Sequence, residues 1–361
     1  MRIPVNEYNG LPVFARCTEL HELWVPLIEK AYAKIHGCYQ SLISGFLDDG
    51  LSDMTGQVSE KLTIQNPKSN TFPSKEVGDK DTFWKFLLER KADGCMMGCS
   101  TSGGTEGPIQ IDGEPCGVLS GHAYGLIDVF EIPDPDMTNP RKTHRLLRIR
   151  NPWGKGEWKN KWSDESEQLD NHMDKLDAYF KTLPPDEQFR KGEDGTFLMC
   201  YSDWRSVYNK VFISVNFPDK WNAIRYSSMF EKDCSGGLPG KPEESKVDWA
   251  MNPQYYFEAK KDMEIFLSLG QDDGRRVQPN GKYFKFPYSE LIHPICLTVC
   301  KVKGKQKVEK FDKDIVISTS VLKEHREVSI RIKVTKGHYI FVPAAREKGS
   351  EGPFFLSIYY D

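Results

Sequence analysis

The chain has 361 residues, of which 39% are hydrophobic and 28% are charged, and its formal net charge is −3 at pH 7. This balance is typical of a folded chain of two or three domains and excludes a disordered one. The small net charge gives no reason to expect nucleic acid as a partner. No apolar run approaches the roughly 20 residues that cross a bilayer, so no transmembrane segment is expected.

The nine cysteines include no CxxC pair and no zinc-like spacing with histidine. The N-terminal residues lack the apolar core of a signal peptide. We therefore expect reduced thiols, mostly packed as small hydrophobic side chains, in an intracellular and cytoplasmic protein.

The part of the chain before residue 209 mixes helical and strand-like patterns. Apolar side chains at helical spacing predict a helix over residues 19–36, ended by Gly37. Residues 41–56 carry turn residues and predict a looser segment, and residues 79–94 predict a second helix that starts at Asp79 or Asp81. Strands are predicted over 95–102, 122–132, 145–153 and 196–201, with a short helix over 171–179.

Composition changes near residues 209–220, and short strand-like runs separated by turn-rich clusters follow. This spacing is typical of an antiparallel β-sandwich, here over residues 218–361. The predicted strands cover 254–259, 263–269, 295–303, 313–319, 327–334, 338–343 and 353–360.

Two motifs at the ends of neighbouring predicted strands carry the chemistry. The first is GHAY, with His122, and the second is RNPWG, with Asn151 and Trp153. Taken alone, His122 is explained as a satisfied histidine at a strand end, and Asn151 before a proline as a turn residue. Together, about thirty residues apart and in this order, they offer an imidazole that takes a proton from a thiol and an amide that orients it.

The segments around these motifs resemble the calpain family of cysteine proteases. The resemblance includes GHAYGLIDVFEI, RLLRIRNPWGKGEWKNKWSD and GEDGTFLMCYSDW, and toward the C-terminus WNAIRY, NPQYYFEA and GHYIFVPA. It implies an α+β fold, with a partial papain-like protease core followed by an antiparallel β-sandwich domain. Residues 1–45 would be a remnant of the first protease half-domain, 46–209 the second half-domain, and 218–361 the sandwich.

The resemblance also implies roles for single residues. His122 would be the general base, Asn151 its orienting partner, and Trp153 a cover over the hydrogen bond between them. Calpains carry their nucleophilic cysteine in a GDCW-like segment upstream of the helix that matches residues 19–36, with an oxyanion-stabilising glutamine nearby. This sequence contains neither, so the chain alone is expected to be inactive.

Cys17 is the alternative thiol, because it lies just before a predicted helix, whose dipole favours a thiolate at the N-terminus. Its surroundings, FARCTEL, do not match GDCW. The helix that follows was built to pack on the absent segment, so its apolar side chains Trp24, Leu27 and Ile28 are expected to be partly exposed.

Acidic residues in two loops predict a calcium site. A hard cation takes several oxygen ligands from carboxylates and carbonyls. The loop after the RNPWG motif offers Glu157 and Asp164, and GEDGT offers Asp194 and the carbonyl of Gly192. A solvated acidic surface is the alternative explanation.

The resemblance implies that these positions form the Ca²⁺ site of the second protease half-domain. Thr196 stands where a carboxylate is usual, and a hydroxyl is the weaker ligand. Glu22 matches one carboxylate of the other calcium site of the family, whose remaining ligands belong to the absent segment, so that site is not expected to form.

Two functions remain open from the sequence. One is calcium-dependent limited proteolysis of intracellular proteins, with protein substrates as partners. The other is a non-catalytic calpain-like protein that binds calcium, lipid or other proteins. Alternating lysines would share one face of a hairpin and could contact acidic membrane lipid, although lysines that protect a strand edge from aggregation are the favoured explanation. These are Lys301, Lys303, Lys305 and Lys307.

Overall fold

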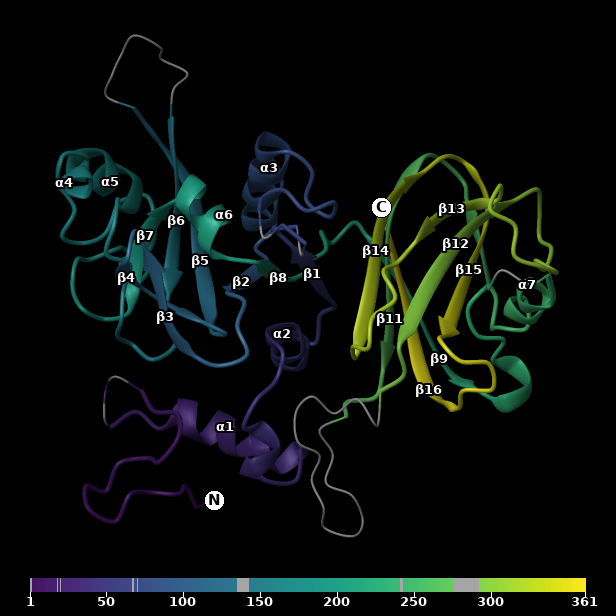
Figure 1. Ribbon diagram of the computed structural model, residues 1–361, viewed down its shortest axis with the longest axis horizontal. Coiled ribbons are helices and arrows are strands. Elements are labelled where there is room, and N and C mark those ends of the chain that lie inside the picture. The colour runs from purple at the N-terminus through teal and green to yellow at the C-terminus, as the bar shows by residue number, and fades with distance from the viewer. Residues whose placement is uncertain are drawn as a thin grey trace. The chain divides into compact units, whose positions relative to one another are not determined.

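A computed structural model describes the chain apart from residues 1, 18, 20, 67, 70, 135–142, 241–242 and 275–291 (Figure 1). Its internal contacts group the chain into two compact units. One unit comprises residues 47–218, and the other comprises residues 1–46 together with residues 219–361. Both sequence motifs lie in the first of these units, which therefore positions the candidate site.

The unit of residues 47–218 is built on an antiparallel sheet with helices packed on it. Its strands are β1 Ser59–Thr63, β2 Met96–Ser100, β3 Gly107–Ile111, β4 Glu114–Ser120, β5 Ala123–Pro133, β6 Thr143–Arg150, β7 Thr196–Cys200 and β8 Lys210–Ser214. Its helices are α2 Leu47–Thr55, α3 Lys80–Ala92, α4 Glu167–Asp170, α5 Met173–Phe180 and α6 Tyr201–Val207. Six strands form one sheet in the order β1-β8-β2-β5-β6-β7, and β3 and β4 form a separate hairpin.

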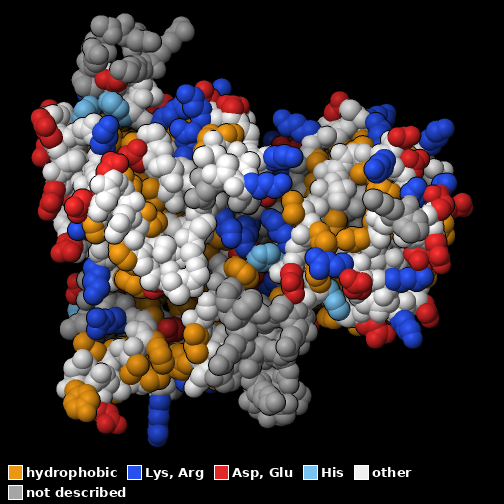
Figure 2. Space-filling view, in the orientation of Figure 1, with side chains coloured by type: hydrophobic (Ala, Val, Ile, Leu, Met, Phe, Trp, Pro, Cys, Tyr) orange, Lys and Arg blue, Asp and Glu red, His pale blue; other side chains and the backbone are white. Residues whose placement is uncertain are grey.

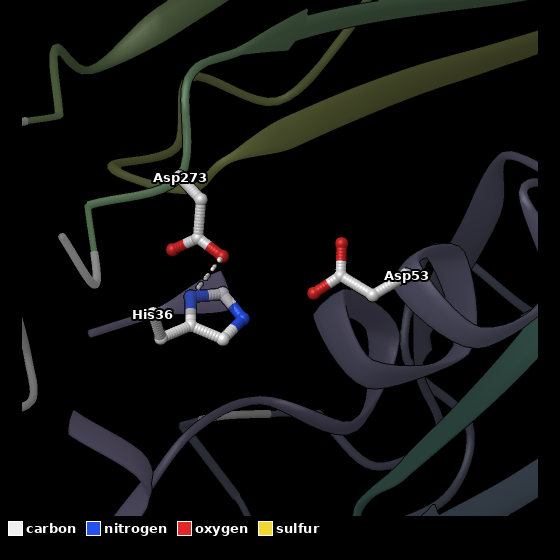
Figure 3. Close-up of side chains that lie close together, drawn as sticks. All are labelled: His36, Asp53 and Asp273. Atoms are coloured by element: carbon white, nitrogen blue, oxygen red, sulfur yellow. Dashed lines mark ion pairs between the residues drawn. The ribbon is translucent and has the colours of Figure 1, made fainter. Parts of the chain in front are cut away.

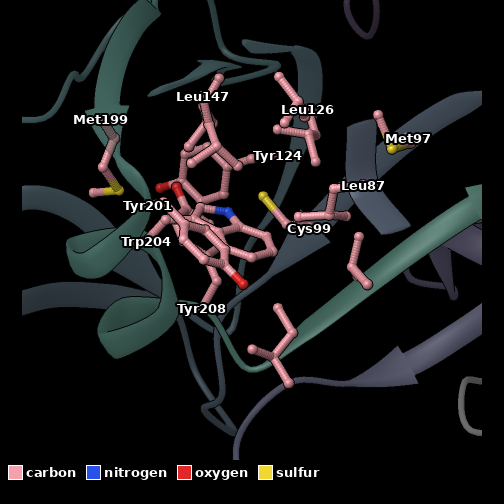
Figure 4. Close-up of a cluster of buried hydrophobic side chains, with 14 of the residues drawn as sticks. Leu87, Met97, Cys99, Tyr124, Leu126, Leu147, Met199, Tyr201, Trp204 and Tyr208 are labelled. Carbon is pink, nitrogen blue, oxygen red and sulfur yellow. The ribbon is translucent and has the colours of Figure 1, made fainter. Parts of the chain in front are cut away.

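Successive side chains of a strand point to opposite faces of the sheet. In the central strands apolar side chains point to both faces, so the sheet is buried on both. Leu147 and Ile149 of β6 face a core that they share with α3 and α6. Phe130 of β5 and Leu146 of β6 face a second core with α4 and α5. Figure 4 shows the first core, in which Trp204 of α6 packs among residues of the sheet. Each large apolar side chain buried in this way contributes about 1.5–3 kcal/mol.

Helix α3 starts as the sequence predicts, because the Asp79 carboxylate accepts the backbone N–H groups of Asp81 and Thr82. The sequence did not predict several other elements of this unit, among them α2 and the β3–β4 hairpin. Residues 47–55 form α2, although the segment 41–56 was expected to be irregular. The β3–β4 hairpin turns at Asp112 and Gly113, whose φ angles are +54° and +87°. Such a turn suits a two-residue hairpin loop.

The other unit contains the predicted β-sandwich, in which all strand pairs are antiparallel. Its strands are β9 Asn222–Phe230, β10 Tyr255–Ala259, β11 Met263–Gln271, β12 Ile295–Val302, β13 Val316–Thr319, β14 Glu327–Val334, β15 Gly337–Ala345 and β16 Gly352–Tyr360. They form two sheets, in the orders β10-β15-β12-β13 and β14-β11-β16-β9. Apolar side chains of both sheets meet in a shared core, among them Leu267 of β11 and Leu297 of β12.

Strand β9 was not predicted, since most of its side chains are exposed and little apolar alternation marks it. It pairs along its whole length with β16. The short helices η2 Lys232–Cys234 and α7 Glu243–Trp249 interrupt the β structure. Trp249 of α7 packs with Cys300 and Ile340 in a small core of its own.

Residues 1–46 contain α1 Trp24–Ile35 and η1 Tyr39–Leu42. Helix α1 begins later than predicted, and no side chain caps its N-terminus. Trp24, Leu27 and Ile28 are exposed, as expected, and Figure 2 shows apolar side chains gathered over this helix. After the helix, His36 Nδ1 lies 3.6 Å from Asp273 Oδ2 (Figure 3). The assignment of residues 1–45 to a first protease half-domain stays a prediction.

Candidate active site and acidic loops

The pairing of two strands brings the two motifs together. His122 immediately precedes β5, and Asn151 immediately follows β6. These strands are antiparallel neighbours with Gly125 opposite Arg150. Because the start of one antiparallel strand lies beside the end of its partner, the imidazole and the amide meet at this edge of the pair.

His122 Nε2 lies 3.1 Å from Asn151 Oδ1. The same oxygen accepts the Trp153 backbone N–H at 3.1 Å, and Asn151 Nδ2 donates to the Gly156 carbonyl at 3.3 Å. These contacts fix the orientation of the amide, so Nε2 carries the proton in its bond to Oδ1. Both side chains are buried, with His122 7% and Asn151 1% exposed, which limits competition from water for this bond.

Aromatic rings hold the imidazole on two sides. The Trp153 ring centroid lies 4.7 Å from that of His122, and the Tyr124 ring meets it edge-on at 4.9 Å. Trp153 is 52% exposed, so one part of its ring covers the imidazole while another part meets solvent. Burial raises the pKa of Tyr124 to about 12, and this phenol therefore stays neutral beside the imidazole.

The remaining nitrogen of the imidazole also has a partner. Glu106 Oε1 lies 2.8 Å from His122 Nδ1. Glu106 belongs to the loop between β2 and β3, and its side chain is 48% exposed. No sequence motif pointed to this residue. The only trace of it in the sequence is an acid in a glycine-rich loop, TSGGTEG, shortly before GHAY.

The predicted calcium ligands lie in two loops that are hydrogen-bonded to each other. Glu157 Oε1 accepts the Gly195 N–H at 2.7 Å, and Asp164 Oδ2 accepts the Gly192 N–H at 2.8 Å. We call residues 157–164 and 192–196 the acidic loops. The structure thus brings together both parts of the ligand set that the sequence predicts.

Two further predicted ligands follow within the second acidic loop. Asp194 Oδ1 accepts the Thr196 N–H at 2.7 Å. The Gly192 carbonyl accepts the Asp194 N–H at 2.8 Å. Thr196 is buried at the start of β7, so its hydroxyl has little freedom to reorient.

The chemistry of the acidic loops fits a hard cation. The second oxygen of Asp164, Oδ1, is buried and has no hydrogen-bond partner among the residues that the structure describes. Burial raises the pKa of Glu157 and of Asp164, and the nearby charge of Asp194 acts in the same direction on both. Among the described residues, the ligand atoms of the three carboxylates do not all lie within 4.8 Å of one another. A bound cation would therefore draw the loops closer together.

One residue, Gly195, connects the acidic loops to the backbone of Asn151, whose side chain bonds to His122. Gly195 donates its N–H to Glu157 and accepts the Asn151 N–H on its carbonyl at 2.8 Å. Its φ is +84°, and a Cβ there would lie 2.8 Å from the Lys155 nitrogen. The backbone therefore approaches so closely that only glycine fits without a shift.

In the described part of the chain, no cysteine is a recorded partner of His122. Within the same unit Cys95, Cys99 and Cys116 are buried, and burial raises the pKa of Cys99 to about 12. Cys17 belongs to the unit of residues 1–46 and 219–361 and is half-buried. Glu22, in that unit as well, accepts the Trp24 indole N–H at 3.2 Å.

Comparison with known proteins identifies the family of the chain. Residues 2–215 match the profile of the calpain family of cysteine proteases, and residues 226–359 match that of domain III of the calpain large subunit. The chain therefore belongs to the calpain family. The predicted fold class is confirmed as an α+β protease part followed by antiparallel sheets.

Similar proteins come from plants and animals. The calpain-type cysteine protease DEK1 of Arabidopsis thaliana is 27% identical over 98% of this chain and 15% of its own length. Calpain-5 of Mus musculus is 26% identical over 98% of this chain and 54% of its own. The calpain-2 catalytic subunit of Homo sapiens is 26% identical over 99% and 49%. The chain thus spans about half the length of these animal relatives and a smaller share of the plant protein. Among the described residues, no helix is both long and apolar enough to cross a membrane.

Proposed function

We propose that this chain carries the base and the orienting amide of a calcium-dependent cysteine endopeptidase that cuts cytoplasmic proteins at a limited number of sites. The observation that carries the proposal is the buried hydrogen bond between His122 Nε2 and Asn151 Oδ1, 3.1 Å long, beside the Trp153 ring. A general base has to be held in one orientation and to present its other nitrogen to the proton that it takes. The bond to Asn151 meets the first requirement through Nε2, so the proton would be taken at Nδ1, which lies beside Glu106 in this structure.

In this mechanism His122 accepts the proton of a cysteine thiol at Nδ1 while Nε2 keeps its bond to Asn151. The amide oxygen stabilises the imidazolium, which later gives the proton to the leaving amine of the substrate. We assign none of the nine cysteines to that thiol and propose that the chain by itself is inactive. The nucleophile would be supplied by the whole protein outside this sequence, with Cys17 as the alternative.

Calcium, when bound, would supply positive charge between the acidic loops. Glu157, Asp164, Asp194 and the Gly192 carbonyl would hold it, with Thr196 as a weak additional ligand. The Gly195 carbonyl accepts the backbone N–H of Asn151. Ordering of the loops would therefore affect the position of Asn151, whose side-chain amide orients His122.

A denatured protein substrate in the presence of calcium tests the proteolytic role. A chain extended by a GDCW-like upstream segment is expected to cleave it, and His122→Ala in that chain to lower kcat/KM by at least about a thousandfold. The matched control is His21→Ala, at an exposed histidine of the other unit. Undiminished cleavage by His122→Ala would refute the proposal. Thiol-sensitive cleavage by the present chain would instead assign the nucleophile to Cys17.

Titration calorimetry on the present chain tests the metal role. One weak calcium-binding event is expected, weakened at least about tenfold by Asp194→Ala and strengthened by Thr196→Glu. The control, Asp186→Ala, changes an exposed aspartate outside the acidic loops. If no heat is released at millimolar calcium, or if Asp194→Ala binds as the wild type does, the loops are ordinary acidic surface.

A second candidate function is contact between the sandwich and acidic membrane lipid. Strand β12 ends at Val302, so the alternating lysines do not continue along one strand. Lys305 and Lys307 nevertheless line one cavity of about 600 Å³ together with Tyr256. Vesicles that contain phosphatidylserine should bind the chain more strongly than neutral vesicles. The double variant Lys305→Gln/Lys307→Gln should lose this preference, and the equally charged control Lys260→Gln/Lys261→Gln should keep it.

A further inference from the structure

The nitrogen that a base needs is already in use in this structure. Asn151 Oδ1 can only accept, so it takes the proton on His122 Nε2. On the other side of the ring, Glu106 Oε1 lies 2.8 Å from Nδ1. Either Nδ1 carries a second proton and donates it to the carboxylate, or a protonated carboxyl donates to Nδ1. In both cases the lone pair of Nδ1 is not free to accept a proton from a thiol.

Glu106 is placed so that its side chain can leave without the loop opening. The backbone on either side is tied down, because the Ser102 N–H donates to Asn209 Oδ1 at 2.6 Å and Ser120 Oγ donates to the Thr105 carbonyl at 3.1 Å. The carboxylate itself is about half exposed, and among the described residues its recorded partner is His122. A change of side-chain rotamer is therefore enough to release Nδ1.

We propose that Glu106 is a gate on His122: its carboxylate occupies the place of the thiolate on Nδ1 and has to move aside before His122 can act as a base. The proposal rests on the function proposed above, in which His122 is that base. A carboxylate and a thiolate carry the same charge, so each can pair with the imidazolium while Asn151 holds the ring. The gate thus keeps the ring oriented while the nucleophile is away from it.

Acylation of histidines by diethyl pyrocarbonate tests the gate on the present chain, because an imidazole nitrogen with a free lone pair attacks this reagent at its carbonyl carbon. The rate at His122 is measured by peptide mass spectrometry at pH 7 and divided by the rate at exposed His21. Glu106→Ala should raise this ratio about tenfold or more, the factor expected for losing a hydrogen bond to a charged group. Glu106→Gln, which keeps the size of the side chain, should raise it less.

The matched control is Glu114→Ala, at an exposed glutamate of β4 in the adjacent hairpin, and it should leave the ratio unchanged. An unchanged ratio in Glu106→Ala would overturn the gate. So would a rise that extends to His144 and His172, because general loosening of the unit means that Glu106 is only structural. The assay needs no thiol and no substrate. A longer protein that fails to cleave would refute the proteolytic function and not the gate, whereas an unchanged ratio would remove the gate and leave His122 as a base.

Discussion

Gly195 is the residue at which the second acidic loop meets the backbone of Asn151. Its N–H and carbonyl serve Glu157 and Asn151 in turn, so its position affects both groups. A Cβ at this residue would lie within 3.0 Å of three backbone atoms, and none of them can move independently of the loop. The positive φ adds strain for any other residue.

We predict that Gly195→Ala lowers the free energy of unfolding by about 1–3 kcal/mol and weakens calcium binding. Urea unfolding and calorimetry measure the two effects. Gly104→Ala is the control, because a Cβ at Gly104 meets nothing within 4 Å. Equal unfolding midpoints for the two variants would mean that the close approach at Gly195 has no energetic weight.

Cys99 differs from a reactive cysteine through its burial, which raises its pKa to about 12. The thiolate is the reactive form, so we predict that Cys99 resists iodoacetamide at pH 8 in the folded chain. The exposed Cys234 should be alkylated in the same sample. Mass spectrometry of the labelled peptides measures both, and fast labelling of Cys99 would show that the core around Trp204 opens.

The elements were predicted where the apolar pattern is strong. Strands β5 and β6 alternate apolar side chains, and the His122 and Asn151 motifs at their ends were found through them. The segment of α2 has a weaker pattern, because Gly50 lies within it and its acids Asp48 and Asp49 come in the first turn. Glu106 could not be predicted, because its contact with His122 depends on how the loop before β3 folds back. No residue spacing encodes that path.

The acidic loops predict a dependence of stability on pH. Burial raises the pKa of Asp164 above its ordinary value, so the folded chain binds that proton more tightly than the unfolded chain does. The protonated Asp164 carboxyl therefore adds to the stability of the folded chain. This contribution is fully present below the unfolded pKa of about 4 and is lost as the pH rises through the pKa of the folded chain. At neutral pH without calcium, the Asp164 charge therefore destabilises the unit.

We predict that Asp164→Asn raises the melting temperature in EDTA at pH 7 and that the gain shrinks toward pH 4. Solvent screens a half-exposed carboxylate, so the gain should stay below about 1 kcal/mol. Calcium should stabilise the wild type and not the variant. Asp186→Asn is the control, and a loss of stability in Asp164→Asn at pH 7 would contradict the direction of the pKa shift.

At the scale of the whole molecule, exposed apolar side chains on α1 affect how the chain behaves in solution. Trp24 is 59% exposed and Ile35 is 77% exposed. Apolar surface of this kind is typical of a contact with another segment or protein. The chain spans about half the length of its animal relatives.

We predict that the isolated chain self-associates through this helix, and that Trp24→Glu/Ile35→Lys returns it to a monomer. Sedimentation velocity at increasing protein concentration measures the effect. Val321→Glu, at an exposed valine of the sandwich, is the control. Association that persists in the double variant would place the contact elsewhere.

The hairpin beside Glu106 is packed onto the first acidic loop. A Cβ on Gly117 of β4 would lie only 1.7 Å from the Glu157 carbonyl oxygen, and the Lys159 N–H donates to the Cys116 carbonyl at 3.0 Å. The hairpin and the loop are therefore in direct contact, with Glu106 near one end and the proposed cation ligands at the other. Thermodynamic reciprocity then applies: if calcium favours release of Glu106, release of Glu106 must favour calcium by the same factor. In that case, a chain whose gate is open would bind calcium at lower concentrations than a chain whose gate is closed.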